Sequence, residues 1–190
     1  QQELEEVLYS NLEEFSRMSR MVSDMLFLAQ ADNNQLIPEQ QALDLAEEVH
    51  KVFEFFEAWA EEKAVALRFV GSHCRVIGDP LMLRRAISNL LSNAIRYTPA
   101  GQAVTIQLSE SAETVRLVVE NPGTPIAAEH LPRLFDRFYR VDPSRQRKGE
   151  GSGIGLAIVK SIVGAHHGSV AAQSDLRSTR FIVVLPKQAQ

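Results

Sequence analysis

Apolar residues recur every three or four positions over the first thirty residues of the chain. Leu4, Leu8, Phe15, Met18 and Val22 lie on one such seam, and the pattern predicts a long helix over residues 3–31. A heptad seam is typical of helices that pack at a shallow angle in a bundle or coiled coil. One helix alone cannot bury it, so we favour half of a dimerising hairpin. The alternative is a helix folded onto the rest of the chain.

Polar residues and Pro38 end this periodicity, and we interpret residues 35–38 as a linker before a second domain over 39–190. Shorter apolar patterns in that domain predict strands at 41–45, 65–70, 75–77, 104–108, 115–120, 169–173 and 180–185, and helices at 46–62, 80–97 and 154–166. This order predicts an α+β fold: a two-layer α/β sandwich with a mixed sheet packed on helices, preceded by the long N-terminal helix.

Composition narrows the function classes. The formal net charge of −4 argues against a nucleic-acid-binding protein, which is usually basic. A single cysteine, Cys74, rules out an intrachain disulfide and suits a reducing compartment. No apolar run approaches the roughly 18 residues of a membrane-spanning helix. The chain begins with Gln1, so we expect it to be part of a longer protein.

Two asparagines on the predicted 80–97 helix are the first candidate for chemistry. Asn89 and Asn93 are four residues apart and share a face, with Arg96 and Tyr97 one turn further along. Asparagine is a mediocre helix former, which suggests that the amides are used. Amide oxygens are hard ligands that suit Mg²⁺. The alternative is a pair of solvated side chains on an exposed face.

A run of alternating glycines is the second candidate. Gly149, Gly151, Gly153 and Gly155 precede an amphipathic helix that opens with Leu156. Glycines let backbone amides approach phosphate oxygens, and a helix N-terminus adds free N–H donors and a favourable dipole. The spacing matches neither a Walker loop nor, convincingly, a Rossmann fingerprint. A flexible loop without a ligand remains the alternative.

Two further motifs lie between the first two. Asn121-Pro122-Gly123 leaves a predicted strand, and Phe135 and Phe138 are flanked by arginines that include Arg140. Aromatic rings can shield a nucleotide base, and arginines can neutralise phosphates. Taken alone, the two phenylalanines are better explained by ordinary packing under a loop.

Together, the motifs resemble those of a known family. Asn-x-x-x-Asn-Ala, Asn-Pro-Gly, Phe-x-x-Phe and Gly-x-Gly-x-Gly-Leu, in this order, resemble the N, G1, F and G2 boxes of sensor histidine kinases. The resemblance covers essentially the whole chain. Residues 79–86 and 135–142 are most similar to heavy-metal sensor kinases of the copper/silver-resistance type.

The resemblance implies the Bergerat ATP-binding sandwich, with ATP and Mg²⁺ as ligands. Asn93 would hold Mg²⁺ with help from Asn89, Arg96 would reach a phosphate, and Tyr97 would pack near the adenine. The full set of ATP-site residues that it implies is Asn89, Asn93, Arg96, Tyr97, Asn121, Gly123, Ile126, Phe135, Phe138, Arg140, Gly151, Gly153, Gly155, Leu156 and Thr179.

The chain departs from the family pattern at several of these places. Asn121 stands where most members have an aspartate that accepts a hydrogen bond from the adenine amino group; the amide oxygen still accepts, without charge. Pro125 replaces a usual glycine, and Ser178 replaces the glycine before Thr179. Residues 139–152 would form the mobile ATP lid.

The nature of residue 89 bears on the reaction. Related ATPases carry a glutamate there as base for water, and Asn89 cannot abstract a proton, which favours phosphoryl transfer to a separately supplied nucleophile. In the family, that nucleophile is a histidine in a His-Glu-Leu-Arg-Thr-Pro-like motif on the first helix of a dimeric hairpin. The motif is missing here. Residues 1–34 would then be the second hairpin helix, with the first truncated away.

The five histidines suggest structural roles at the sequence level. We expect His50 to be a surface or packing residue, and His130 to cap a turn. His166 and its neighbour His167 end a predicted helix, where the dipole favours a cation. His73 next to Cys74 lacks the partners of a metal site, so we place any metal sensing outside this chain.

We therefore expect the catalytic ATP-binding region of a sensor histidine kinase. It would transfer the γ-phosphoryl group of ATP to a histidine on the missing helix, for relay to an aspartate of a response regulator. The full-length protein would be a homodimer through the hairpin helices, would not bind nucleic acid, and would touch the bacterial inner membrane only through segments outside this cytoplasmic chain. A same-fold ATPase or nucleotide-gated dimerisation module, and a non-catalytic interaction module with a vestigial pocket, remain alternatives.

Overall fold

The computed structural model describes residues 2–141 and 153–187. The chain forms two compact units, Gln1–Leu36 and Ile37–Gln190. The first unit contains one helix, α1 (Gln2–Asp32), which matches the helix predicted over 3–31. Apolar side chains along it, including Leu8, Phe15 and Val22, are exposed. The assignment of residues 1–34 to a dimerisation hairpin stays a prediction.

The second unit contains the remaining helices and strands. In chain order these are β1 (Gln41–Asp44), α2 (Leu45–Glu62), β2 (Ala66–Val70), β3 (Arg75–Gly78), α3 (Pro80–Tyr97), β4 (Ala103–Glu110), β5 (Thr114–Asn121), the 3-10 turn η1 (Leu131–Arg133), α4 (Gly155–Ala165), β6 (Ser169–Ser174) and β7 (Thr179–Pro186). Each predicted helix and strand is confirmed, with bounds that differ by two residues or fewer. The 3-10 turn lies in a stretch where we predicted irregular structure.

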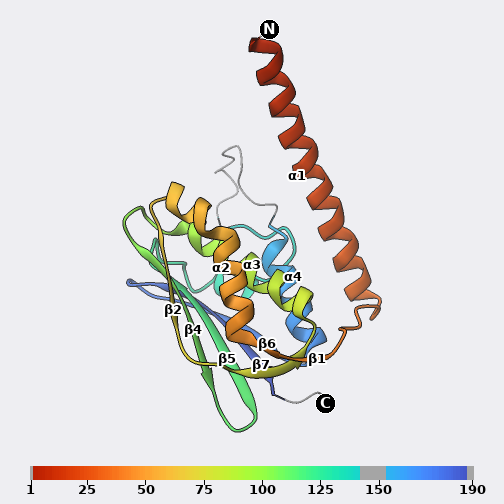
Figure 1. The fold of residues 1–190 in the computed structure, drawn as a ribbon, viewed down its shortest axis with the longest axis vertical. Helices are drawn as coiled ribbons and strands as arrows, with labels where there is room; N and C mark the ends of the chain where they lie inside the picture. The colour runs from red at the N-terminus through yellow and green to blue at the C-terminus, as the bar shows by residue number, and fades with distance from the viewer. Residues whose placement is uncertain (1, 142–152, 188–190) are drawn as a thin grey trace. The chain divides into compact units, whose positions relative to one another are not determined.

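Five strands form the main sheet in the order β2-β4-β5-β7-β6, and β1 pairs with β3 in a separate two-stranded sheet. Three pairings of the main sheet are antiparallel, and β2 runs parallel to β4, so the sheet is mixed. The helices α2, α3 and α4 cover one face of this sheet (Figure 1). The predicted two-layer sandwich with a mixed sheet is confirmed.

The hydrophobic core lies between the helices and the sheet. Alternate residues of β5 and β7 are paired across the strands and buried, as are apolar residues of the helix faces above them. The fully buried side chains include Leu90 and Leu91 of α3 and Ile158 and Ile162 of α4. Burial of a side chain of this size stabilises the fold by roughly 1.5–3 kcal/mol.

The aspartate before α3 organises the start of that helix, as its N-cap position predicts. Asp79 Oδ1 accepts hydrogen bonds from the backbone N–H groups of Leu81 and Met82, and Oδ2 accepts one from Glu39 N–H at 3.0 Å. The carboxylate thereby holds the chain just after the linker against α3. Burial pushes the pKa of the Asp79 carboxyl up, but these backbone hydrogen bonds outweigh it, so the pKa lies below its usual value.

The backbone of the same residue meets a buried histidine. Asp79 N–H donates to His166 Nε2 at 2.9 Å, and His166 Nδ1 donates to the Ile162 carbonyl at 2.7 Å. A ring that accepts at Nε2 and donates at Nδ1 is neutral. This corrects our expectation of a cation at this helix end: His166 is buried and joins the end of α4 to the beginning of α3.

The depressed pKa of Asp79 predicts a pH-dependent contribution to stability. The ionised carboxylate stabilises the fold above its unfolded-state pKa of about 3.9, and this contribution is lost as pH falls through the lower folded-state pKa. We expect Asp79→Asn, which can still cap α3, to be less stable than the unsubstituted chain near neutral pH. The gap should narrow at low pH. Urea unfolding at a series of pH values measures it, and a gap of constant size would contradict this account.

Candidate functional site

The first two sequence motifs meet between α3 and α4. Asn89 and Asn93 share one face of α3, and both are half-buried. A Cβ added at Gly155, the first residue of α4, would lie 3.4 Å from Asn89 Oδ1. Within the described part of the chain, Asn89 Nδ2 is buried and has no hydrogen-bond partner. Asn89 is therefore not a solvated surface residue, and a glycine is what leaves room in front of it.

The N-terminus of α4 provides backbone donors at the same place. Ile154 occupies the N-cap position and offers no side-chain hydrogen bond to the helix. The first amide of the helix that bonds back within it is that of Ile158, to the Ile154 carbonyl at 3.0 Å. The N–H groups of Gly155 and Leu156 thus belong to the unpaired first turn, which is a favourable environment for an anion.

A second group of site residues lies at the end of the sheet. Asn121 of β5 pairs with Thr179 of β7, and Thr179 pairs with Ser174 of β6. Directly paired residues point to the same face of a sheet. The next pair on this face, Val119 and Phe181, is apolar and buried. The apolar core on this face of the sheet therefore ends at a row of three polar side chains.

A serine that the sequence analysis missed connects this row to the G1 motif. Ser174 Oγ accepts a hydrogen bond from Ile126 N–H at 2.9 Å and shares one with Thr179 Oγ1 at 2.8 Å. The only sequence signal is weak: Ser174 is in phase with Val170 on a strand that alternates in burial. Such a signal does not separate a functional serine from an ordinary strand end.

The G1 motif itself packs tightly against α3. Asn121 Nδ2 donates to the Pro122 carbonyl at 3.1 Å, which orients the buried amide. Gly123 has a φ of 153°, and a Cβ there would lie 2.8 Å from the Tyr97 carbonyl oxygen. Only glycine allows this approach. The turn therefore lies at the C-terminal end of the helix that carries the two asparagines.

The serine that replaces a family glycine also has a structural role. Ser178 is buried, and its hydroxyl donates to Glu120 Oε1 at 2.5 Å. This bond ties the turn before Thr179 to the strand that ends in Asn121. The serine at position 178 thus adds a hydrogen bond at the end of the sheet where Asn121 and Thr179 lie.

The F motif divides into a core residue and an exposed one. Phe135 is buried and meets Phe181 edge-to-face, with ring centroids 6.3 Å apart. Phe138 is 58% exposed, has a φ of 60°, and its N–H donates to the Gly153 carbonyl at 2.9 Å. Packing under the motif therefore explains Phe135, whereas Phe138 brings the F and G2 motifs together.

Beside this contact, Tyr139 is held by two side chains. Its hydroxyl lies 2.6 Å from His130 Nδ1, and the Arg133 guanidinium carbon lies 4.3 Å from the centre of its ring. His130 precedes η1 but makes no side-chain capping bond, which corrects the capping role we expected. Its partner is the tyrosine that begins the predicted lid.

Some predicted site residues lie at the edge of this arrangement or beyond it. Arg96 and Tyr97 are exposed at the end of α3, and Arg140 is half-buried. Gly151 and most of the predicted lid, residues 142–152, lie outside the described residues.

The described residues offer no ready-made carboxylate, histidine or cysteine metal centre, because no three such side chains there lie close enough together. His73 Nδ1 contacts Asp44 Oδ2, and the adjacent Cys74 is buried, with burial raising the pKa of its thiol. Protein ligands for Mg²⁺ would therefore be amide oxygens such as that of Asn93.

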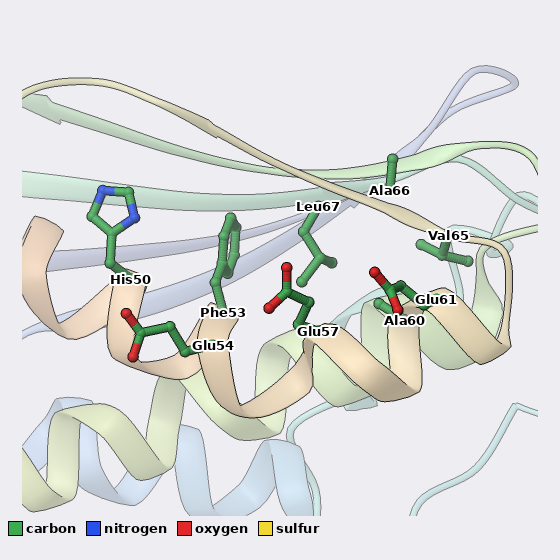
Figure 2. A pocket seen from close by; sticks show the side chains of 9 residues that line it. All are labelled: His50, Phe53, Glu54, Glu57, Ala60, Glu61, Val65, Ala66 and Leu67. Atoms are coloured by element: carbon green, nitrogen blue, oxygen red, sulfur yellow. The ribbon is translucent and has the colours of Figure 1, made fainter.

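A cavity among the described residues lies elsewhere on the domain. It measures about 460 Å³ and lies between α2 and β2, whose side chains face it in Figure 2. Its lining includes Glu54, Glu57 and Glu61, which would repel phosphate groups. None of its lining residues belongs to the four motifs, so the motif cluster and this cavity are different places on the domain.

Comparisons with known proteins agree with the motifs. The family model of histidine kinase-, DNA gyrase B- and HSP90-like ATPases matches residues 78–189. The chain is 72% identical over 186 residues to the sensor histidine kinase CusS of Escherichia coli O6:H1, which covers 98% of this chain and 39% of CusS. It is 64% identical over 191 residues to the probable sensor kinase SilS of Salmonella typhimurium, covering 98% of this chain and 38% of SilS. The chain thus spans about two fifths of the length of these relatives.

Solved structures share the fold. Acinetobacter baumannii histidine kinase AdeS superimposes with a TM-score of 0.82 at 24% identity, covering 95% of this chain and 83% of that one. Full-length ShkA in complex with AMPPNP superimposes with a TM-score of 0.82 at 25% identity, covering 94% and 37%. The predicted family and fold are confirmed. The chain belongs to the histidine kinase-, DNA gyrase B- and HSP90-like ATPase family, as the catalytic ATP-binding region of a sensor histidine kinase.

Proposed function

We propose that this chain binds ATP with Mg²⁺ and presents the γ-phosphoryl group to a histidine on a helix outside the chain. An aspartate of a response regulator would then receive the phosphoryl group. The observation that carries the proposal is the approach of Asn89 on α3 to the side-chain-free start of α4 at Gly155. This arrangement places an amide, unpaired backbone donors and a helix dipole around one small space.

The phosphates would lie at the N-terminus of α4. The backbone N–H groups of Gly153, Gly155 and Leu156 would donate to their oxygens, and a side chain at Gly155 would fill the space they need. Asn89 Nδ2, buried without a partner among the described residues, would gain an acceptor when a phosphate binds. Arg96 and Arg140 would add further phosphate contacts.

The amides of α3 also fit a magnesium ion. Asn93 would hold Mg²⁺ with help from Asn89, because these side chains share a face and carry hard oxygen ligands. The described residues include no cluster of carboxylates there. Phosphate oxygens would therefore supply Mg²⁺ ligands that the protein does not. When bound, the ion would neutralise charge on the phosphates.

The base would lie at the polar end of the sheet. Asn121 Nδ2 is engaged with the Pro122 carbonyl, so the amide oxygen is the atom left to accept from an adenine amino group. Thr179 and Ile126 also border the proposed position of the base beside Asn121. Gly123, which packs against the end of α3, lies next to it. The exposed Tyr97 and Phe138 would supply the aromatic surroundings of the base, and Phe135 would support them from the core.

The side chains available favour transfer over hydrolysis. Asn89 cannot act as a base toward water. His166 has both ring nitrogens engaged in the core, and Nδ1 of His130 and of His73 contact Tyr139 and Asp44. In this proposal the nucleophile would come from another segment or another chain.

The wider assembly follows from the same proposal. The exposed apolar side chains of α1 suit the second helix of a dimerisation hairpin in a homodimer. A neighbouring structure of the same fold is the histidine kinase ThkA in complex with response regulator protein TrrA, which supports that class of partner. Among the described residues no helix is both long and apolar enough to cross a bilayer. Contact with the inner membrane would come from other segments of the protein.

Removal of the proposed metal ligand should abolish the effect of Mg²⁺ on nucleotide binding. We expect Asn93→Ala to weaken binding of a fluorescent ATP analogue by about tenfold or more in Mg²⁺, and far less in EDTA. Ser88→Ala, on the same helix, is the matched control and should leave binding unchanged. If Asn93→Ala bound the analogue in Mg²⁺ with the affinity of the unsubstituted chain, the assignment would be contradicted.

A methyl group at the start of α4 should weaken nucleotide binding without lowering the stability of the fold. A Cβ at Gly155 makes only an ordinary contact with Asn89, so we expect Gly155→Ala to unfold at the same or a higher temperature. Its affinity for the ATP analogue should fall about tenfold, because the methyl group blocks the approach of phosphate. Gly164→Ala, in the same helix with open space around it, should keep full affinity.

Incubation of the chain with radiolabelled ATP and Mg²⁺ should leave no label on any of its histidines. The reason is that the accepting histidine lies outside the chain. Steady release of inorganic phosphate would instead favour the same-fold ATPase. Label on a histidine of this chain would refute the proposed division between donor and acceptor.

A further inference from the structure

We propose that Ser174 is a positioning residue for recognition of the nucleotide base. Its hydroxyl links Ile126, in the loop that follows the G1 motif, to Thr179. It thereby directs the Thr179 hydroxyl hydrogen toward the base. This inference rests on the proposed nucleotide site and adds a residue that none of the four motifs contains. It makes base recognition depend on β6, one of the two edge strands of the five-stranded sheet.

The placement of Ser174 follows from strand register. It ends β6 directly opposite Thr179, which lies directly opposite Asn121, so the three side chains form one row on the helix-facing side. Asn121 and Thr179 are buried, at 4% and 6% exposure. Ser174 therefore lies on the face of the sheet where the base is proposed to bind, and not on the outer face.

The hydrogen bonds give the row a direction. Ile126 N–H donates to Ser174 Oγ at 2.9 Å, and the two hydroxyls share one hydrogen atom across 2.8 Å. An oxygen that accepts a hydrogen bond becomes a stronger donor, so Ser174 preferentially donates to Thr179 Oγ1. The Thr179 hydroxyl hydrogen is then free for a ligand. The chain of donors runs from the Ile126 amide through both hydroxyls to the base.

This direction selects one class of base. Asn121 offers an oxygen as acceptor, because its Nδ2 is engaged with the Pro122 carbonyl. Thr179 offers a donor beside it. An adenine presents a 6-amino donor next to the N1 acceptor, whereas a guanine presents the reverse pattern. The row is thus complementary to a 6-aminopurine nucleotide, with the Thr179 hydroxyl reaching N1 directly or through one water molecule.

A chemical double-mutant cycle tests this role. The affinities of the full 190-residue chain and of Ser174→Ala are measured for ATP and for 1-deaza-ATP, which lacks the N1 acceptor. In the unsubstituted chain we expect ATP to bind more tightly than 1-deaza-ATP by roughly fivefold, the value of one hydrogen bond. In Ser174→Ala this preference should disappear.

Two further variants control for structural effects. Ser174→Thr keeps the hydroxyl and suits a strand, so it should retain the preference for ATP. Ser169→Ala removes an exposed hydroxyl at the other end of β6 and should change neither affinity. Thermal unfolding of each variant shows whether the sheet is intact.

The possible outcomes distinguish failure of the Ser174 role from failure of the proposed nucleotide site. An unchanged ratio of ATP to 1-deaza-ATP affinity in Ser174→Ala would overturn the positioning role, even if both affinities fell together. Failure of the unsubstituted chain to bind either nucleotide would instead contradict the proposed nucleotide site. Loss of the preference in Ser174→Ala and its retention in Ser174→Thr would support the inference.

Discussion

The antiparallel packing of α3 against α4 is the constraint on which the rest of the domain depends. The two helices are joined at two places: Asp79 N–H bonds to His166, and Asn89 lies against Gly155. These places are ten residues apart on α3 and eleven on α4. At 1.5 Å per residue the separations are about 15 Å and about 16.5 Å, so both contacts form without bending either helix. A rigid pair of this kind keeps the start of α4 facing the asparagines.

Local patterns were sufficient to predict most of the fold. The periodicity of residues 80–97 and the cap at Asp79 are local signals, and α3 has the predicted bounds. The parallel pairing of β2 with β4 was not predictable in the same way. Strand direction depends on how α3 crosses the sheet between them, and no feature of either strand's own sequence encodes it.

The candidate site shows the same division. Asn89, Asn93 and Gly155 were predicted as site residues because amides inside a helix and glycines before one are unusual for their local structure. Ser174 and His166 were missed or misjudged because their roles come from partners far along the chain, Ile126 and Asp79. A serine in a strand and a histidine after a helix violate no local rule. Only the tertiary contact distinguishes them from surface residues.

The substitution of Asn121 for the aspartate of the family pattern is best understood together with its surroundings. A buried carboxylate at 4% exposure would carry a desolvation penalty, which a neutral amide avoids. The cost of an amide is ambiguity, because its two ends have opposite hydrogen-bonding character. The bond from Nδ2 to the Pro122 carbonyl removes that ambiguity and leaves the oxygen as acceptor. The backbone carbonyl of Pro122 would thus determine which end of the amide a base meets in the proposed site.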